Sequence, residues 1–220
     1  MKRAARLFFS LLAIPLLRLQ AGNTWDGDGP GNAWSTGANW NNDAAPANDG
    51  TAAIVFPVNT RTKPAGPVVN VDAPQDIWSL TLNEAFTFTN ATLTLRGGAL
   101  TASKGTISND VVLGAHAVWA INGGGGSDTL SVFGSVSDGG EGYGLTKTNI
   151  RTLDLRANNT YKGPTVSRAT EGYLYLRGTN DTCFIHCNGG NLYALGACPS
   201  VTGALLSAGT LAVGTDASLG

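Results

Sequence analysis

The chain has 220 residues, including 30 glycines and one methionine; 13% of its residues are charged, and the net charge is −1 at pH 7. Because helix interiors exclude glycine, this composition excludes a mainly helical protein and favours short strands joined by many turns. The near-neutral charge excludes a global field that would recruit nucleic acid or an anionic membrane, and the length suits a single all-β domain.

Residues 1–21 have the pattern of a secretory signal peptide. Basic residues precede the apolar run Leu7–Leu17, which is shorter than the roughly 20 residues needed to span a bilayer. We therefore expect cleavage after Ala21, export of the chain, and no stable membrane insertion of the mature segment. An uncleaved anchor is the alternative, which the short, proline-interrupted run disfavours.

Residues 22–57 contain three tryptophans within 16 positions, namely Trp25, Trp34 and Trp40. Such side chains are unfavourable in water, and a stack of β-coils needs a cover for the unpaired backbone groups of its first coil. We interpret this region as an N-terminal cap. The alternative is a platform on which sugar rings stack, because aromatic faces offer such contacts.

Alternating apolar and polar residues recur through residues 58–220, and turn residues separate the runs. Several runs contain a triplet with an apolar residue at its first and third positions. Two of the four steps between successive triplet starts are 23 (153−130) and 21 (174−153) residues, which is close to one coil of a solenoid. The triplets are Leu93–Leu95, Leu130–Val132, Leu153–Leu155, Leu174–Leu176 and Leu211–Val213.

One stretch carries a family resemblance. Gly144–Thr148 reads GLTKT, Leu153–Leu155 reads LDL, Ala157–Gly163 reads ANNTYKG, and Thr165-Val166 follows. This order resembles the autotransporter-associated β-strand repeat, and the Trp-rich opening is similar to the start of exported solenoids of the same family. The copy departs from the consensus where Asn149, Arg151 and Arg156 stand in place of two glycines and a serine.

The resemblance implies an all-β fold, a right-handed parallel β-helix, in a bacterial protein that is secreted or held at the outer-membrane surface. It implies a scaffold rather than an active site. It also implies a C-terminal β-barrel or sorting tail, and this sequence has no such pattern. The chain stops at Asp216–Gly220 without a capping pattern, so we expect it to be a fragment of a longer protein.

No cofactor is expected from the residues that could bind metal. Cys183, Cys187 and Cys198 lie near His186, but their spacing matches no standard zinc site, and an exported chain favours one disulfide plus a leftover thiol. Gly123–Ser131 fits one calcium-binding nonapeptide, yet calcium there needs tandem copies, so we expect a turn.

No catalytic residues are assigned, and we do not expect an enzyme. The two histidines, His116 and His186, lie in no recognisable triad, and Asp154 has no second carboxylate at the equivalent place in a neighbouring repeat. The alternative is a lyase or hydrolase that acts on polysaccharide from a β-helix scaffold.

Arg96, Arg156 and Arg177 each follow one of the triplets directly. Equivalent positions of stacked coils lie about 4.8 Å apart, so Arg156 and Arg177 are expected one above the other. They would form a basic strip that contacts acidic polysaccharide or lipopolysaccharide. Alternatively, Asp154, Glu171 or solvent screens them. We therefore predict a structural or adhesive rod whose candidate glycan contacts are these arginines and the three tryptophans.

Overall fold

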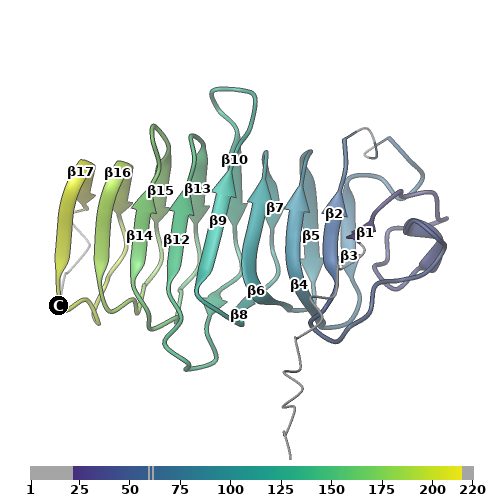
Figure 1. Cartoon of the computed structure of the whole chain (residues 1–220), viewed down its shortest axis with the longest axis horizontal. Coiled ribbons are helices and arrows are strands. Elements are labelled where there is room, and N and C mark those ends of the chain that lie inside the picture. Colours follow the sequence, from purple (N-terminus) through teal and green to yellow (C-terminus); the bar gives the residue numbers. More distant parts are fainter. Residues whose placement is uncertain (1–21, 59, 61, 215–220) are drawn as a thin grey trace, which may run out of the picture.

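The computed structural model describes residues 22–58, 60 and 62–214, so the predicted signal peptide lies outside the described residues. The chain forms a β-solenoid of about seven turns whose coils stack along one axis (Figure 1). The pairings between named strands are all parallel, and the 3-10 turn η1 (Gly37–Asn39) is the only helical element among the described residues. The prediction of an all-β parallel solenoid is confirmed.

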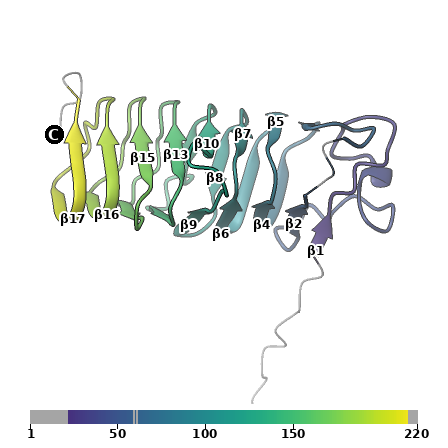
Figure 2. The same cartoon turned by 90° about the horizontal axis from the view of Figure 1, so that it is seen from above.

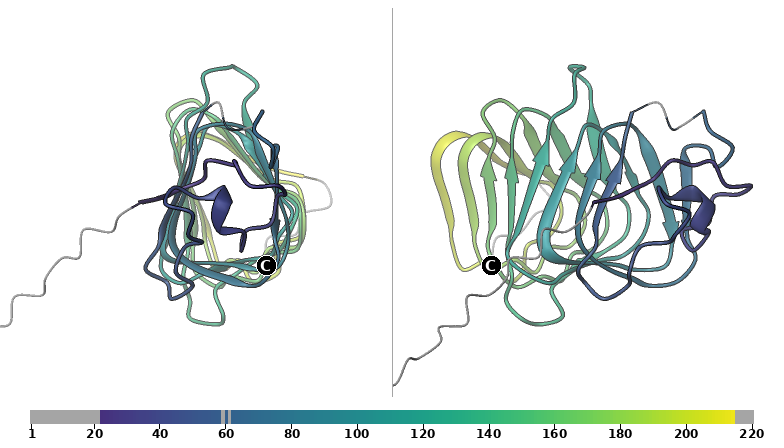
Figure 3. Two further views of the ribbon diagram at one scale, coloured as in Figure 1. Left: turned by 90° about the vertical axis from the view of Figure 1, so that its right-hand side faces the viewer. Right: turned by 45° about the vertical axis from the view of Figure 1, so that its right-hand side comes forward.

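Each coil has three faces, and strands of successive coils pair within a face. Figure 2 shows the strands in ranks along the axis, and the end-on view in Figure 3 shows the coils superposed around a common interior. The first face contains β1 (Gly22–Thr24), β2 (Ala53–Phe56), the later part of β4 (Gln75–Leu82) and of β6 (Leu93–Ala102), β9 (Ala117–Ile121), β12 (Leu145–Thr148), β14 (Thr165–Arg168) and the early part of β16 (Ile185–Ala194) and of β17 (Ala204–Val213).

The other two faces complete the coil. The second face contains β3 (Val68–Val71), β5 (Phe86–Asn90), β7 (Gly105–Ile107), β10 (Thr129–Val132), β13 (Thr152–Leu155), β15 (Tyr173–Leu176) and the later part of β16 and β17. The third face contains the early part of β4 and β6, β8 (Val111–Leu113) and β11 (Val136–Ser137), and the bridge between Asn159 and Asn180 extends it.

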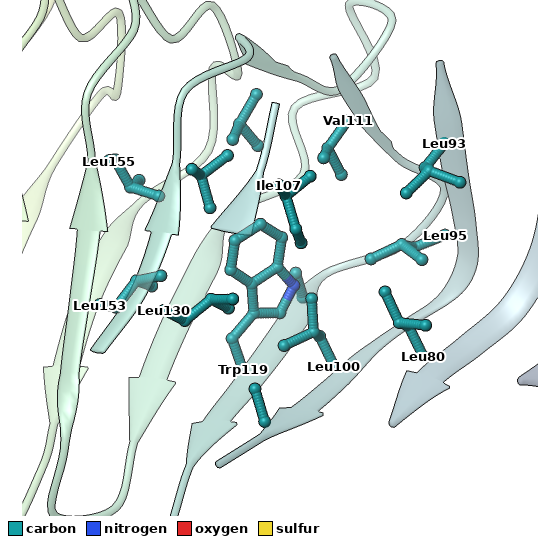
Figure 4. Close-up of a cluster of buried hydrophobic side chains, with 14 of the residues drawn as sticks. Leu80, Leu93, Leu95, Leu100, Ile107, Val111, Trp119, Leu130, Leu153 and Leu155 are labelled. Carbon is teal, nitrogen blue, oxygen red and sulfur yellow. The ribbon is translucent and has the colours of Figure 1, made fainter. Parts of the chain in front are cut away.

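Apolar side chains alternate inward along each strand and fill the interior. Trp119 of β9 is fully buried in this interior, and side chains from all three faces surround it (Figure 4). Alternation with period two is what a strand with one buried face requires. The labelled residues around it are Leu80, Leu93, Leu95, Leu100, Ile107, Val111, Leu130, Leu153 and Leu155.

An aromatic cluster closes the N-terminal end. Trp40 meets Trp25 and Trp34 edge-on, with ring centroids 5.1 and 4.9 Å apart, and its Nε1 donates to the Trp34 carbonyl oxygen at 2.7 Å. Phe56 of β2 packs beneath these rings and also contacts Phe86 and Phe88 of β5. The cluster therefore continues directly into the solenoid core.

Candidate surface site on the second face

The second face presents two arginines and three tyrosines on its outer side. In the strand register Asp154 lies beside Tyr175, and Tyr175 beside Tyr193. Arg156 and Arg177 come two residues after Asp154 and Tyr175, so they also occupy equivalent places on adjacent coils. We call this surface the arginine–tyrosine face; it consists of Phe133, Asp154, Arg156, Tyr173, Tyr175, Arg177 and Tyr193.

Asp154 joins the two arginines. The Arg156 Nε donates to Oδ2 at 2.9 Å, and the Arg177 Nε donates to Oδ1 at 2.6 Å. The Asp154 side chain is 4% exposed, whereas each arginine side chain is 43% exposed. The carboxylate lies on the outer side of its strand, as the alternation predicts, but the arginines cover it. Asp154 therefore pairs with both arginines and neutralises one of their two positive charges.

Aromatic rings fix the positions of both guanidinium groups. The Arg156 Cζ lies 4.8 Å from the ring centroid of Phe133, and the Arg177 Cζ lies 4.8 Å from that of Tyr175. Such cation–π contacts add to the shared carboxylate. Each arginine contacts Asp154 through its Nε atom alone, and the Nη atoms of both have no hydrogen-bond partner among the described residues.

The three tyrosines form one stack beside the arginines. The ring centroids of Tyr175 and Tyr193 are 5.1 Å apart, and those of Tyr173 and Tyr175 are 5.9 Å apart with an interplanar angle of 5°. Burial, followed by the neighbouring Tyr193 and Tyr173, raises the pKa of Tyr175. Their hydroxyl groups make no hydrogen bond to another described residue, so the stack leaves polar atoms available at the surface.

These tyrosines were not among the site residues predicted from the sequence. Tyr173 and Tyr175 alternate with leucines, and Tyr193 follows Tyr175 by 18 residues (193−175), which is close to one coil. Alternation alone could assign them to the outer side of a strand. It could not show that the coil between Tyr175 and Tyr193 is short enough to place the two rings in contact.

Arg96 does not belong to this surface. The triplet Leu93–Leu95 pairs with β8 and the early part of β4, which places it on the third face, whereas the triplets that contain Asp154 and Tyr175 lie on the second. Arg96 therefore lies on a different face from Arg156 and Arg177, although all three follow a triplet. Its Nε and Nη2 instead donate to both carboxylate oxygens of Asp76, at 2.7–2.9 Å.

The three tryptophans are buried rather than presented to solvent. Trp25 and Trp40 are 0% exposed and Trp34 is 1% exposed. A sugar ring would need an open aromatic face, and none of the three indoles has one. The burial contradicts the platform interpretation and agrees with the cap interpretation.

The cysteine-rich segment forms no disulfide. Cys183, Cys187 and Cys198 are all free thiols, and Cys187 and Cys198 are buried. The expected disulfide with a leftover thiol is therefore not found. His186 contacts Ser207 Oγ at 2.9 Å. Within the part of the chain that the structure describes, no group of three or more His, Cys, Asp or Glu side chains could hold a metal ion.

The nonapeptide match spans the turn between β9 and β10 and the first residues of β10. Asp128 accepts a hydrogen bond from the Gly125 amide at 2.6 Å and lies 3.4 Å from Lys104 Nζ. The Gly125 amide, together with Lys104, holds the pKa of this carboxyl below its usual range, although burial opposes the shift. Asp128 thus closes its own loop, beside a shallow hollow of about 370 Å³ lined in part by Lys104.

Two further titratable groups lie in or near the interior. Lys147 of β12 points into the core above Trp119, and its Nζ donates to the Asn149 carbonyl oxygen at 2.7 Å. Burial lowers the pKa of Lys147 from 10.5 to about 8. His116 Nδ1 accepts a hydrogen bond from the Gly144 amide at 3.0 Å. These contacts hold a strand and a turn in place.

Comparisons with protein-family models, with curated proteins and with solved structures found no match to this chain. The likeness to the autotransporter-associated repeat therefore depends on the residue pattern alone. No helix among the described residues is long and apolar enough to cross a membrane.

Proposed function

We propose that this chain is an exported bacterial surface or extracellular β-solenoid with a structural or adhesive role, a passenger-like segment of an autotransporter-type protein. Its signal-peptide pattern supports export, and its repeat pattern supports the family. The proposed partners are polysaccharides or cell-surface glycans, which the rod contacts through its second face.

The observation that carries this proposal is the arginine–tyrosine face. Stacked parallel strands hold its side chains on a rigid ladder, and Asp154 and Phe133 restrain the arginines further. Aromatic and arginine side chains are the types that contribute most to binding surfaces. Because they are ordered before a ligand arrives, little conformational entropy is lost on binding.

The alternative, a polysaccharide lyase or hydrolase, has no comparable support. Glycoside hydrolysis needs two carboxyl groups across one bond. Asp154 is the carboxylate of the arginine–tyrosine face, and two arginines already occupy it. An assay that follows binding and product release together separates the two functions.

The test measures binding of the purified protein to immobilised neutral and acidic polysaccharides, and measures soluble product in the same wells. We expect binding without product. Tyr173→Ala, which removes a ring at the open margin of the stack, should weaken binding, whereas Phe184→Ala, which removes a ring from another face, should not. Product release would instead identify an enzyme, and binding that Tyr173→Ala leaves unchanged would place the contact elsewhere.

A further inference from the structure

We infer that Arg156 and Arg177 together bind the carboxylate of an acidic sugar residue, a hexuronate within a polysaccharide. This inference rests on the proposed function, because it assigns the ligand class of the same face. Each arginine commits its Nε to Asp154, which leaves four Nη atoms of two guanidiniums at a surface where both side chains are 43% exposed.

The charge of the site favours one added anion. Two guanidiniums and one carboxylate leave a net charge of +1. The register places Thr152, Ser131 and Asn191 at the neighbouring outer positions of the second face, and none of these side chains is charged. Among these outer positions Asp154 is the only carboxylate, and the two arginines cover it. An anionic group that binds across Arg156 and Arg177 is therefore not repelled by a further carboxylate at these positions.

Geometry favours a carboxylate. Equivalent positions on adjacent coils lie about 4.8 Å apart, so two oxygens of one planar group can each meet a different guanidinium. Arginine matches carboxylates through paired, parallel N–H donors. Phe133 and Tyr175 hold the two guanidiniums from the side, so the donors need no rearrangement to receive the ligand.

The tyrosines supply the sugar-binding part of the site. Tyr175 contacts Arg177 directly, and Tyr173 and Tyr193 extend the aromatic surface away from the arginines. Tyrosine combines an apolar ring with a hydroxyl that donates and accepts hydrogen bonds, which suits a ring carrying several hydroxyl groups. A hexuronate presents both features together, an acid group and a hydroxylated ring.

The test compares polygalacturonate with the fully methyl-esterified form of the same polymer, which retains the sugar backbone and loses the charge. Binding is measured for the wild-type protein and for the double variant Arg156→Gln with Arg177→Gln. We expect the wild type to bind the free acid at least about tenfold more tightly than the ester, and the double variant to lose this preference. The control is Arg96→Gln with Arg168→Gln, which removes two positive charges from other faces and should retain the preference.

A second variant keeps the test decisive if the glutamine variant is unstable. Arg156→Lys with Arg177→Lys preserves both charges beside Asp154 but removes the planar guanidinium groups. This variant should fold, as checked by circular dichroism, and should still lose most of the preference for the free acid over the ester. Equal binding of free acid and ester by the wild type would overturn the carboxylate site while leaving polysaccharide binding intact. Binding to neither polymer nor to any other polysaccharide would overturn both proposals.

Discussion

Arg177 reaches across one coil to Asp154, and its Nε donates to Oδ1 at 2.6 Å. The register would place Asp154 beside Tyr175, so the arginine side chain turns back along the face to make this contact. Arg156, two residues from Asp154 on the same coil, takes the other oxygen. One buried carboxylate therefore links neighbouring coils on the outside of the solenoid, where backbone pairing is otherwise the main connection.

Replacing this carboxylate should weaken the fold. Asp154→Asn keeps the shape of the side chain but removes the charge that two arginines share, so we expect the free energy of unfolding to fall by about 1–3 kcal/mol. Urea denaturation followed by circular dichroism measures this change. Asp181→Asn is the matched control, because Asp181 pairs with Lys162 at the surface, where an ion pair contributes about 0–1 kcal/mol. Equal effects of the two substitutions would show that burial gives Asp154 no special weight.

The repeated coil could be predicted from the sequence, but the pairing of its strands could not. The triplets that begin at Leu130, Leu153 and Leu174 do pair with one another, as their spacing predicted. The triplet at Leu93 has the same alternation of apolar and polar residues but lies on another face, because each coil contains more than one alternating run. Spacing thus predicts that a repeat exists, whereas the lengths of the intervening turns decide which runs become neighbours.

Alternation along the strands predicts the side of the sheet on which Lys147 and Asp154 lie, but not their partners. Lys147 follows Leu145 by two residues, so alternation places its side chain inside. In the sequence Lys147 was interpreted only as part of the GLTKT motif, so its burial was not predicted. Pairing of the two arginines with Asp154 was one of the alternatives that the sequence left open. Only the side-chain geometry could decide between arginines paired with this carboxylate and arginines without such a partner.

The tryptophan cap should be essential for stability. Trp40 is fully buried between Trp25, Trp34 and Phe56, so Trp40→Ala leaves a large cavity and should lower the free energy of unfolding by about 3–5 kcal/mol. Thermal and urea unfolding measure the loss. Trp78→Ala is the control, since Trp78 is 48% exposed and its loss should have an effect of about 1 kcal/mol or less. A small effect at Trp40 would contradict the cap.

Gly134 should tolerate no side chain. A Cβ atom there would lie 1.9 Å from the Asn109 carbonyl oxygen, which belongs to the backbone of the adjacent coil and cannot rotate away. We expect Gly134→Ala to destabilise the protein by about 1–3 kcal/mol or more, because the coils must separate locally. Gly124→Ala is the control, since no atom lies within 4 Å of its added Cβ, and its stability should match the wild type in urea.

Lys147 should make stability rise with pH. Burial lowers its pKa to about 8 in the folded state, whereas the unfolded value is near 10.5. Between these values the unfolded chain binds the proton and the folded chain does not, so the free energy of unfolding increases with pH. The difference between the unfolded and folded pKa of Lys147, roughly 2.5 (10.5 − 8), corresponds to about 3 kcal/mol at most.

Other buried groups act in the opposite direction. Burial raises the pKa of Tyr161 and of Cys198, so the folded state keeps protons that the unfolded state loses, and stability falls as pH rises above the unfolded pKa of each group. Lys147→Met isolates the lysine, because the variant retains Tyr161 and Cys198 and fills a similar volume. We expect the variant to be more stable than the wild type at pH 7, and this advantage to shrink by about 2–3 kcal/mol towards pH 10. Urea denaturation at a series of pH values measures the difference, and a constant difference would mean that Lys147 keeps its ordinary pKa in the fold.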